Sequence, residues 1–291
     1  MSNESLQRSL LPNNPVDPSI VRVLRALDPI AREGDCSYFV AGATARDLIL
    51  VNIHDLRPGR ATRDIDFGIA VENWGRFALL KKRLTATGVF TSDQRAQQRL
   101  TYSDQTTGFS IPVDLIPFRG VTAVDSTIAW PPSRDTVLNV AGFEEALASS
   151  IPIQIEDDLI VRVASIPGLM ILKLVAWSDR RHETDKDAAD IYRLLTSYAD
   201  AGNTDRLYEN EMNLLEAVGF EMELAGAELL GRDVAQLSSP PALVLIRSVL
   251  EAEPTFESLL NHIVRTSAIA EAAPFVERML SCFRNGLLIN R

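Results

Sequence analysis

The segment Asp64-Ile65-Asp66 constrains this chain more than any other feature, because it places two carboxylates on either side of one apolar residue. Residues two apart on a β-strand point to the same face, so a strand here presents both carboxylates together and turns Ile65 toward the core. A third carboxylate, Asp114, lies in the strand-like segment 111–116. If that segment pairs beside the first, all three carboxylates meet on one patch.

Three hard oxygen donors without a soft ligand nearby favour Mg²⁺ or Mn²⁺ over zinc. The three histidines of the chain are scattered and show no zinc-ligand spacing. We therefore expect Asp64, Asp66 and Asp114 to be metal ligands and catalytic residues, in the arrangement that two-metal phosphoryl or nucleotidyl transfer requires. An Asp-x-Asp pair alone is a weak signal, with a solvated strand edge as the alternative, so the surrounding sequence decides.

A glycine turn at Gly42 supplies part of that context. Residues 37–41 indicate a short buried strand that runs into the turn, and Thr44 is predicted to cap a helix that continues through 48–50. Backbone N–H groups at a helix N-terminus form a ready anion site, so we expect Gly42 and Ala43 to bind the phosphates of a nucleotide. A tight turn without a ligand is the alternative.

Two basic residues are candidate nucleotide ligands. Arg46 lies in the first turns of the predicted helix, where it can reach phosphate or pair with Asp47 or Asp64. Lys173 interrupts the apolar stretch 169–177, where a lysine must extend to solvent, pair with an acid or face a polar cleft. For Lys173 we expect contact with the triphosphate, with extension to solvent as the alternative.

The periodicity of the chain predicts an α+β fold, in which a sheet flanked by helices is followed by a C-terminal helical bundle. Asp17-Pro18 indicates the start of a helix that Gly34 can end. Helical periodicity then persists from Pro167 nearly to the C-terminus. We place an α/β domain at 18–165 and a helical domain at 166–291. Within the first we expect a helix at 72–87, an antiparallel pair at 97–102 and 109–116, and a hairpin at 151–155 and 159–163.

Composition limits the partners and the setting of the chain. With 291 residues, of which 46% are hydrophobic and 23% charged, it is typical of a globular protein. Its net charge of −10 argues against non-specific coating of nucleic acid but leaves room for a local basic site. Cys36 and Cys282 show no paired spacing, and no signal stretch or membrane-length apolar run occurs. We expect a cytoplasmic protein without a membrane partner.

The order of the glycine turn at Gly42, the acidic pair Asp64 and Asp66, and the later Asp114 resembles the nucleotidyltransferase superfamily of DNA polymerase β. The signature of that superfamily is a Gly-Gly or Gly-Ser turn, a short helix, an acidic pair on a strand and a third carboxylate on a later strand. The resemblance implies a nucleotidyltransferase-type mixed sheet and an Mg²⁺- or Mn²⁺-dependent reaction on an NTP.

Within the superfamily, residues 41–47 and 62–67 look most like the AbiEii-type nucleotidyltransferase toxins. That family also carries a helix with a lysine, an arginine-rich turn and a Lys-Asp-x-x-Asp helix, which correspond here to Lys173, residues 179–181 and residues 186–190. The resemblance implies transfer of an NMP to a hydroxyl of RNA, tRNA included, or of a protein. It further implies the toxin of a toxin–antitoxin or phage-defence pair, and hence a cognate antitoxin.

The chain departs from the superfamily pattern at two places. Ala43 stands where the second glycine or serine is usual, and a long gap, residues 44–63, precedes the acidic pair. Arg46-Asp47-Leu48 before such a pair is also similar to the tRNA CCA-adding enzymes, which are the nearest enzymatic alternative. A non-catalytic nucleotide-binding or interaction module with the same fold is a second alternative, which NTP-labelling experiments separate from an enzyme.

Overall fold

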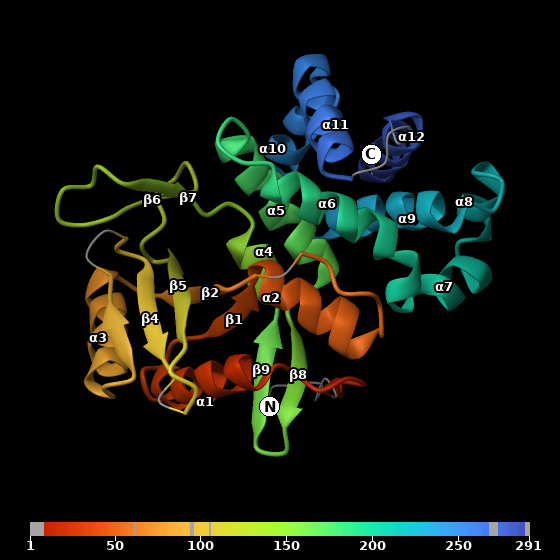
Figure 1. Cartoon of the computed structure of the whole chain (residues 1–291). Coiled ribbons are helices and arrows are strands. Elements are labelled where there is room, and N and C mark those ends of the chain that lie inside the picture. Colours follow the sequence, from red (N-terminus) through yellow and green to blue (C-terminus); the bar gives the residue numbers. More distant parts are fainter. Residues whose placement is uncertain (1–8, 61, 94–95, 105, 268–272, 289–291) are drawn as a thin grey trace, which may run out of the picture. The chain divides into compact units, whose positions relative to one another are not determined.

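The computed structural model describes residues 9–60, 62–93, 96–104, 106–267 and 273–288. The chain divides into two compact units, coloured along the sequence in Figure 1. Met1–Val140 and Ser150–Ser165 make up the first unit, and Ala141–Ser149 and Ile166–Arg291 make up the second. A short helix, α4 (Phe143–Ala148), therefore belongs with the C-terminal helices although two strands of the first unit follow it in the sequence.

The first unit contains a mixed sheet. Its strands are β1 (Tyr38–Ala41), β2 (Ile65–Val71), β3 (Phe90–Ser92), β4 (Arg99–Ser103), β5 (Ser110–Arg119), β8 (Ile151–Glu156) and β9 (Leu159–Val163). Their order across the sheet is β3-β4-β5-β2-β1-β9-β8. β2 pairs in parallel with β5, and β1 with β9, while the other neighbours are antiparallel. This confirms the predicted mixed sheet, including the β4–β5 pair and the β8–β9 hairpin.

The central strands β1 and β2 consist almost wholly of apolar residues, because side chains on both faces of the sheet are covered there. Phe39 and Val40 of β1 are fully buried, as are Phe67 and Ile69 of β2. The polar residues at the ends of these strands therefore adjoin the most deeply buried part of the sheet.

Two helices, α1 (Pro18–Glu33) and α3 (Trp74–Ala86), pack against each other and against the sheet. The start of α1 is the predicted one, since the Asp17 carboxylate accepts a hydrogen bond from the Ser19 N–H at 2.7 Å. Pro18 occupies the first turn, where its missing N–H leaves no helical hydrogen bond unmade. The capping residue and the proline together determine where this helix begins.

The helix after β1 begins earlier than predicted. α2 (Gly42–Asp47) continues directly into the π-helical segment η1 (Leu48–Ile53). The prediction that Thr44 caps this helix is wrong, because Thr44 lies inside it and its hydroxyl donates to the carbonyl oxygen of Asp64 at 3.3 Å. The cause is Gly42, whose φ of +63° turns the chain from strand to helix within one residue.

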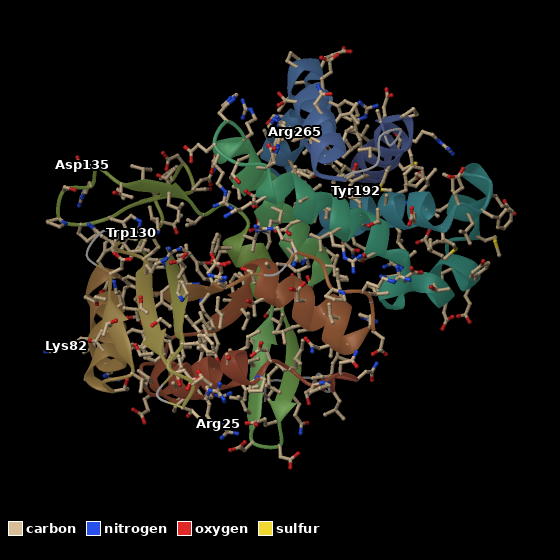
Figure 2. All side chains as sticks on the ribbon, viewed as in Figure 1. Arg25, Lys82, Trp130, Asp135, Tyr192 and Arg265 are labelled. Atoms are coloured by element: carbon tan, nitrogen blue, oxygen red, sulfur yellow. The ribbon has the colours of Figure 1, made fainter. Side chains whose placement is uncertain are left out.

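The segment after β5 packs against α3 through aromatic rings. Trp130, labelled in Figure 2, is 3% exposed, and its ring centroid lies 5.2 Å from that of Trp74 and 5.6 Å from that of Phe77. Tilted and edge-on rings at such distances attract each other. This contact holds the stretch after β5 against α3. The stretch also forms a separate two-stranded ribbon, β6 (Thr127–Ala129) and β7 (Val137–Asn139).

The second unit is helical in its described residues. Besides α4 it contains α5 (Ile166–Arg180), α6 (Lys186–Ser197), η2 (Ala199–Asn203), α7 (Thr204–Glu209), α8 (Met212–Ala217), α9 (Met222–Leu237), α10 (Pro240–Glu251), α11 (Glu253–Ser267) and α12 (Ala273–Leu288). The C-terminal helical region that the periodicity predicts is thus confirmed. Within the part of the chain that the structure describes, none of the helices is both long and apolar enough to cross a membrane.

The helices α9 and α12 pack closely because glycines meet where they cross. A Cβ atom added to Gly231 would lie 2.2 Å from the carbonyl oxygen of Phe283, and one added to Gly286 would lie 2.1 Å from that of Glu228. Only residues without a Cβ allow the two backbones to approach this far. Leu230 of α9 and Met279 of α12 are fully buried and supply part of the apolar core of the unit.

Candidate metal centre

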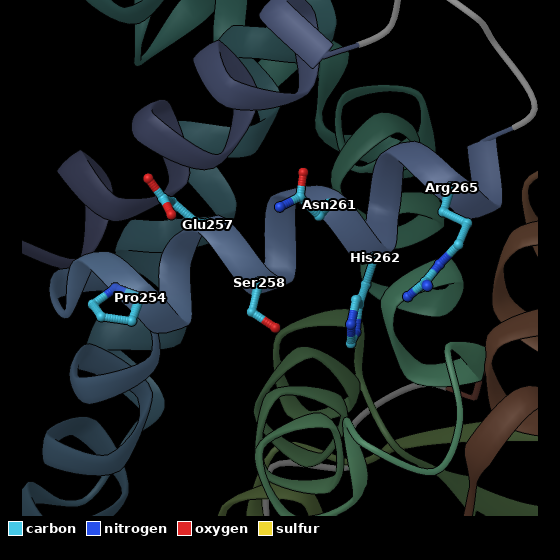
Figure 3. A pocket seen from close by; sticks show the side chains of 6 residues that line it. All are labelled: Pro254, Glu257, Ser258, Asn261, His262 and Arg265. Atoms are coloured by element: carbon cyan, nitrogen blue, oxygen red, sulfur yellow. The ribbon is translucent and has the colours of Figure 1, made fainter.

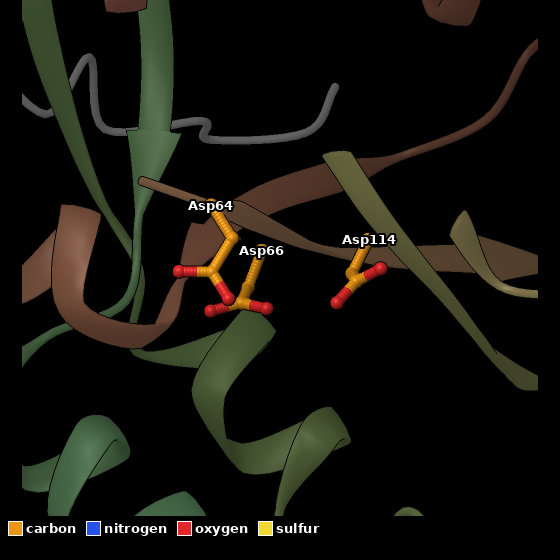
Figure 4. Close-up of side chains that lie close together, drawn as sticks. All are labelled: Asp64, Asp66 and Asp114. Carbon is orange, nitrogen blue, oxygen red and sulfur yellow. The ribbon is translucent and has the colours of Figure 1, made fainter. Parts of the chain in front are cut away.

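Three aspartates meet at one end of the central strands. Asp66 on β2 and Asp114 on β5 are direct partners in the parallel register of the two strands, and Asp64 immediately precedes β2. Alternation along β2 turns Ile65 into the core, where it is 2% exposed, and leaves the aspartates on the other side. One carboxylate oxygen from each of the three lies within 4.8 Å of the others, and Figure 4 shows the three side chains gathered in one place.

The geometry fits divalent metal ions bound by oxygen. Two ligands of one Mg²⁺ ion lie at most about 4.2 Å apart, twice the usual metal–oxygen distance. Because the oxygens of the trio all lie within 4.8 Å of one another, the three carboxylates are close enough to hold one divalent ion, or a pair of ions at the spacing of about 3.5–4 Å seen in two-metal sites. Within the described residues, these aspartates are the one group of three or more acidic, histidine or cysteine side chains close enough to hold a metal.

Hydrogen bonds hold two of the carboxylates in place. The Thr62 hydroxyl donates to Oδ1 of Asp64. Arg99 on β4 donates from Nε to Oδ1 of Asp114 at 2.8 Å and from Nη2 to Oδ2 at 2.7 Å, which is a two-pronged ion pair. The hydrogen bonds to Asp114 raise the pKa of Arg99 above its usual value, against the opposing effect of partial burial. Asp114 is thus oriented by a permanent positive charge.

Arg99 is the residue of this site that sequence reasoning missed. Its position follows from the register of β4 on β5, in which Arg99 lies directly opposite Asp114. The antiparallel pairing of these segments was predicted, but its register was not. A register prediction would have required the exact length of the turn between Ser103 and Ser110.

Gly42 lies against the carboxylate cluster. A Cβ atom added to it would be 1.9 Å from Oδ2 of Asp66, so only glycine leaves room for that carboxylate. The positive φ of Gly42 adds a second reason, since residues with a side chain rarely adopt it. The residue predicted to cradle phosphate is therefore also required for the position of Asp66.

We expect Gly42→Ala to weaken metal binding as well as the fold. The added methyl group would push the Asp66 carboxylate aside and force a left-handed backbone, at a cost of about 1–2 kcal/mol in unfolding free energy. Gly88→Ala is the matched control, because Gly88 has a φ of +77° but nothing within 4 Å of the added Cβ. Both variants should melt earlier, whereas only Gly42→Ala should lose affinity for Mn²⁺ in a calorimetric titration. Equal Mn²⁺ affinity in the two variants would show that Gly42 does not position Asp66.

The other two candidates on α2 are buried. Ala43 is 9% exposed. Arg46 is 4% exposed; its guanidinium pairs with Asp47 at 2.8 Å and donates to the carbonyl oxygen of Arg60 at 3.2 Å. The structure thus shows the pairing with Asp47 that the sequence left open for Arg46. Contact of either residue with a nucleotide stays a prediction.

Lys173 belongs to the second unit, on α5. Its Nζ lies 3.1 Å from Oδ1 of Asp187 and 2.5 Å from Oδ2 of Asp190, and its side chain is 13% exposed. Arg180 donates from Nε to Oδ2 of Asp187 at 2.6 Å. Burial would raise the pKa of Asp187, but the Arg180 hydrogen bonds and the charge of Lys173 outweigh it and lower that pKa. The predicted contact of Lys173 with triphosphate is not tested by this arrangement and stays a prediction.

A pocket in the second unit has too few suitable ligands among its lining residues to form a metal centre. Six residues of α11 line it, shown in Figure 3: Pro254, Glu257, Ser258, Asn261, His262 and Arg265. Glu257 is the one carboxylate among these lining residues. The ring nitrogen Nδ1 of His262 already accepts a hydrogen bond from Nε1 of Trp177 at 3.1 Å. The aspartate cluster of the first unit is therefore the stronger candidate for chemistry.

Solved structures similar to this chain are distant. An antigenic nucleotidyltransferase-like protein from Paracoccidioides brasiliensis is 14% identical, with a TM-score of 0.42, over 70% of this chain and 94% of that protein. The antibiotic-resistance factor ANT(2'')-Ia is 13% identical, with a TM-score of 0.36, over 70% and 98%. A Thermotoga maritima CCA-adding enzyme complexed with tRNA is 14% identical, with a TM-score of 0.26, over 94% and 82%. A search of curated protein sequences finds no match.

The family is shown by a different comparison. The family model described as "Nucleotidyl transferase AbiEii toxin, Type IV TA system" matches residues 24–261. That range includes the glycine turn at Gly42, all three aspartates and Lys173. Because the match spans well over half of the sequence, the chain belongs to the AbiEii nucleotidyltransferase toxins of type IV toxin–antitoxin systems, and its activity is that of a nucleotidyltransferase.

Proposed function

We propose that this nucleotidyltransferase transfers an NMP from an NTP to a hydroxyl group of RNA or protein and that it depends on Mg²⁺ or Mn²⁺. The observation that carries the proposal is the meeting of Asp64, Asp66 and Asp114 within 4.8 Å. Such a cluster of hard ligands is what two-metal transfer to a phosphorus atom requires. The family supports the nucleotidyl class of reaction.

Each residue of the cluster has a proposed task. Asp64 and Asp66 hold the metal, which when bound would neutralise charge on the triphosphate and polarise the phosphorus under attack. The backbone amides of Gly42 and Ala43, beside Asp66, orient the phosphates of the NTP. Asp114, on the neighbouring strand, lies on the acceptor side and accepts the proton of the attacking hydroxyl.

The bonds of the step balance as follows. The acceptor oxygen forms a bond to the α-phosphorus, and the bond from that phosphorus to the bridging oxygen of the leaving pyrophosphate breaks. The hydroxyl proton passes to Asp114 and then to solvent. The products are an NMP-modified acceptor and pyrophosphate.

Asp114→Asn should lower turnover more than NTP affinity, because its proposed task concerns the acceptor. Loss of general-base catalysis lowers the rate by about a hundredfold or more. The dissociation constant for NTP, measured by calorimetry with Mg²⁺, should change by less than about threefold. A tenfold change would correspond to about 1.4 kcal/mol of binding free energy. An equal fall in turnover and in NTP affinity would show that Asp114 acts on the nucleotide and not on the acceptor.

The proposed function is tested by labelling a total cell extract with α-³²P-NTPs, one nucleotide at a time. We expect the purified protein to label RNA or a protein, with loss of the label when EDTA is added. With γ-³²P-NTP the protein should add no label beyond that of extract incubated without it, because pyrophosphate leaves. Label confined to tRNA 3′ ends would favour the CCA-adding alternative, and absence of α-label with all four nucleotides would contradict the proposed transfer.

The family also suggests a protein partner. A toxin of a type IV toxin–antitoxin system has an antitoxin, and we propose that a cognate antitoxin exists for this chain. Co-expression tests this proposal: a neighbouring gene product that restores growth of cells producing the active protein, and has no effect on cells producing Asp64→Asn, would be that partner.

A further inference from the structure

The aspartate cluster has a positively charged neighbour of its own. Arg99 forms a two-pronged ion pair in which each Asp114 oxygen accepts one N–H, at 2.8 and 2.7 Å. The side chain of Asp114 is 12% exposed and that of Arg99 is 34% exposed, so the pair lies at the border between the site and solvent. The charge of Asp64 also acts on Arg99. The guanidinium therefore stands in the field of the cluster.

An arginine in this position conflicts with a metal ion at the same carboxylate. The two oxygens that Arg99 occupies are the atoms that Asp114 would offer as metal ligands. Arginine keeps its positive charge at every physiological pH, so it cannot yield by losing a proton. A divalent ion that binds Asp114 would face this charge across a few ångströms and would be repelled unless the ion pair opens.

The other two carboxylates are not held in this way by Arg99. The hydrogen bonds of its Nε and Nη2 both end on Asp114. The Thr62 hydroxyl donates a hydrogen bond to Oδ1 of Asp64.

We propose that Arg99 is a positioning residue that competes with the divalent ion for Asp114. Asp114 becomes a metal ligand only when Arg99 releases it. This inference rests on the proposed function, since it assumes that the cluster binds metal.

A Mn²⁺ titration of the full chain without nucleotide, followed by the electron paramagnetic resonance signal of free Mn²⁺, tests the competition. Arg99→Gln should tighten the weaker Mn²⁺ site about tenfold, because it removes charge-assisted hydrogen bonds that the ion must otherwise break. Arg99→Lys keeps the charge without the two-pronged geometry and should fall between wild type and Arg99→Gln. Arg76→Gln is the matched control, because Arg76 pairs in the same unit only loosely with Glu72, at 3.8 Å.

A comparison of Asp114→Asn with the double variant Asp114→Asn/Arg99→Gln tests whether Arg99 affects Mn²⁺ binding through Asp114 or through its charge alone. In an Asp114→Asn background, adding Arg99→Gln should tighten Mn²⁺ binding less than it does in wild type, because the ion pair is already absent and only the longer-range charge of Arg99 on Asp64 is removed. Thermal melts in EDTA provide a readout independent of affinity. Arg99→Gln should melt below wild type in EDTA and recover more with Mn²⁺, since the ion then replaces Arg99 as the cation that compensates Asp114.

The outcomes are distinguishable. Unchanged or weaker Mn²⁺ binding in Arg99→Gln would overturn the proposal for Arg99 while leaving the metal centre standing. Tightening of equal size in the Asp114→Asn background would also overturn it, since the effect would then not act through Asp114. If wild type and every variant fail to bind Mn²⁺, the proposed function itself fails.

Discussion

Replacing Asp64 or Asp66 with asparagine should lower nucleotidyl transfer by about a thousandfold or more and leave the fold intact. The metal contributes several kcal/mol to the transition state, and the loss of one charged ligand removes most of that contribution. Stability should respond in the opposite direction. Three carboxylates within 4.8 Å repel one another without metal, so each variant should melt at the same temperature as wild type, or above it, in EDTA.

Asp157→Asn is the matched control for this prediction, because Asp157 is exposed in the turn between β8 and β9. It removes one carboxylate of the same unit without touching the cluster. Initial rates of labelling with the preferred NTP, together with melting curves in EDTA and in Mg²⁺, provide the comparison. Near wild-type rates in Asp64→Asn or Asp66→Asn would show that the cluster has no role in the reaction.

Lys173→Ala should lower the free energy of unfolding by about 3 kcal/mol, because breaking a buried ion pair leaves uncompensated charge behind. Asp187 is fully buried, and Lys173 lies within 3.1 Å of it and 2.5 Å of Asp190. Without the lysine, Asp187 keeps its ion pair with Arg180 but both buried carboxylates lose the charge of Lys173. Urea unfolding at neutral pH measures the loss, with Lys186→Ala as the control because Lys186 is exposed on α6, the helix that carries Asp187 and Asp190.

The pH dependence of the same variant follows from the lowered pKa of Asp187. A carboxyl whose pKa is lower in the folded state stabilises the protein above its unfolded pKa of about 3.9, and this contribution is lost as pH falls through the folded value. Lys173→Ala should therefore show a smaller difference from wild type at pH 3 than at pH 7. A Lys173→Ala protein as stable as Lys186→Ala at pH 7 would contradict the structural role of the lysine.

The same variant addresses the nucleotide role predicted for Lys173. If the lysine contacts the triphosphate, Lys173→Ala should bind an NTP more weakly but bind the corresponding monophosphate as wild type does. If its charge serves the network with Asp187 and Asp190 alone, the affinities for NTP and NMP should both be unchanged in the protein that remains folded. Calorimetry below the melting temperature separates the two.

Much of the fold and of the site could be predicted from local pattern. Alternation around Ile65 was enough to place Asp64 and Asp66 on one face, and an apolar setting was enough to mark Asp114 as a strand residue. Asp17 before a proline marked the start of α1. These features depend on neighbours within a few residues, which is the range over which strand and helix geometry act.

What could not be predicted depends on contacts between distant segments. The meeting of Arg99 with Asp114 needs the register of β4 on β5, which the turn between them decides. The start of α2 at Gly42 was missed because Thr44 has the chemistry of a cap but is held inside the helix, where it donates to the Asp64 carbonyl. The close approach of Gly42 to Asp66 likewise exists only once β1 and β2 pair.

The most direct test of the central claim, that the aspartate cluster is the metal centre of nucleotidyl transfer, is a crystal structure with Mn²⁺ and a non-hydrolysable NTP. Anomalous diffraction should place Mn²⁺ between the carboxylates of Asp64 and Asp66, with the triphosphate bound to that ion beside Gly42. A nucleotide bound elsewhere, or Mn²⁺ absent from the cluster in a protein that still transfers label, would contradict the account.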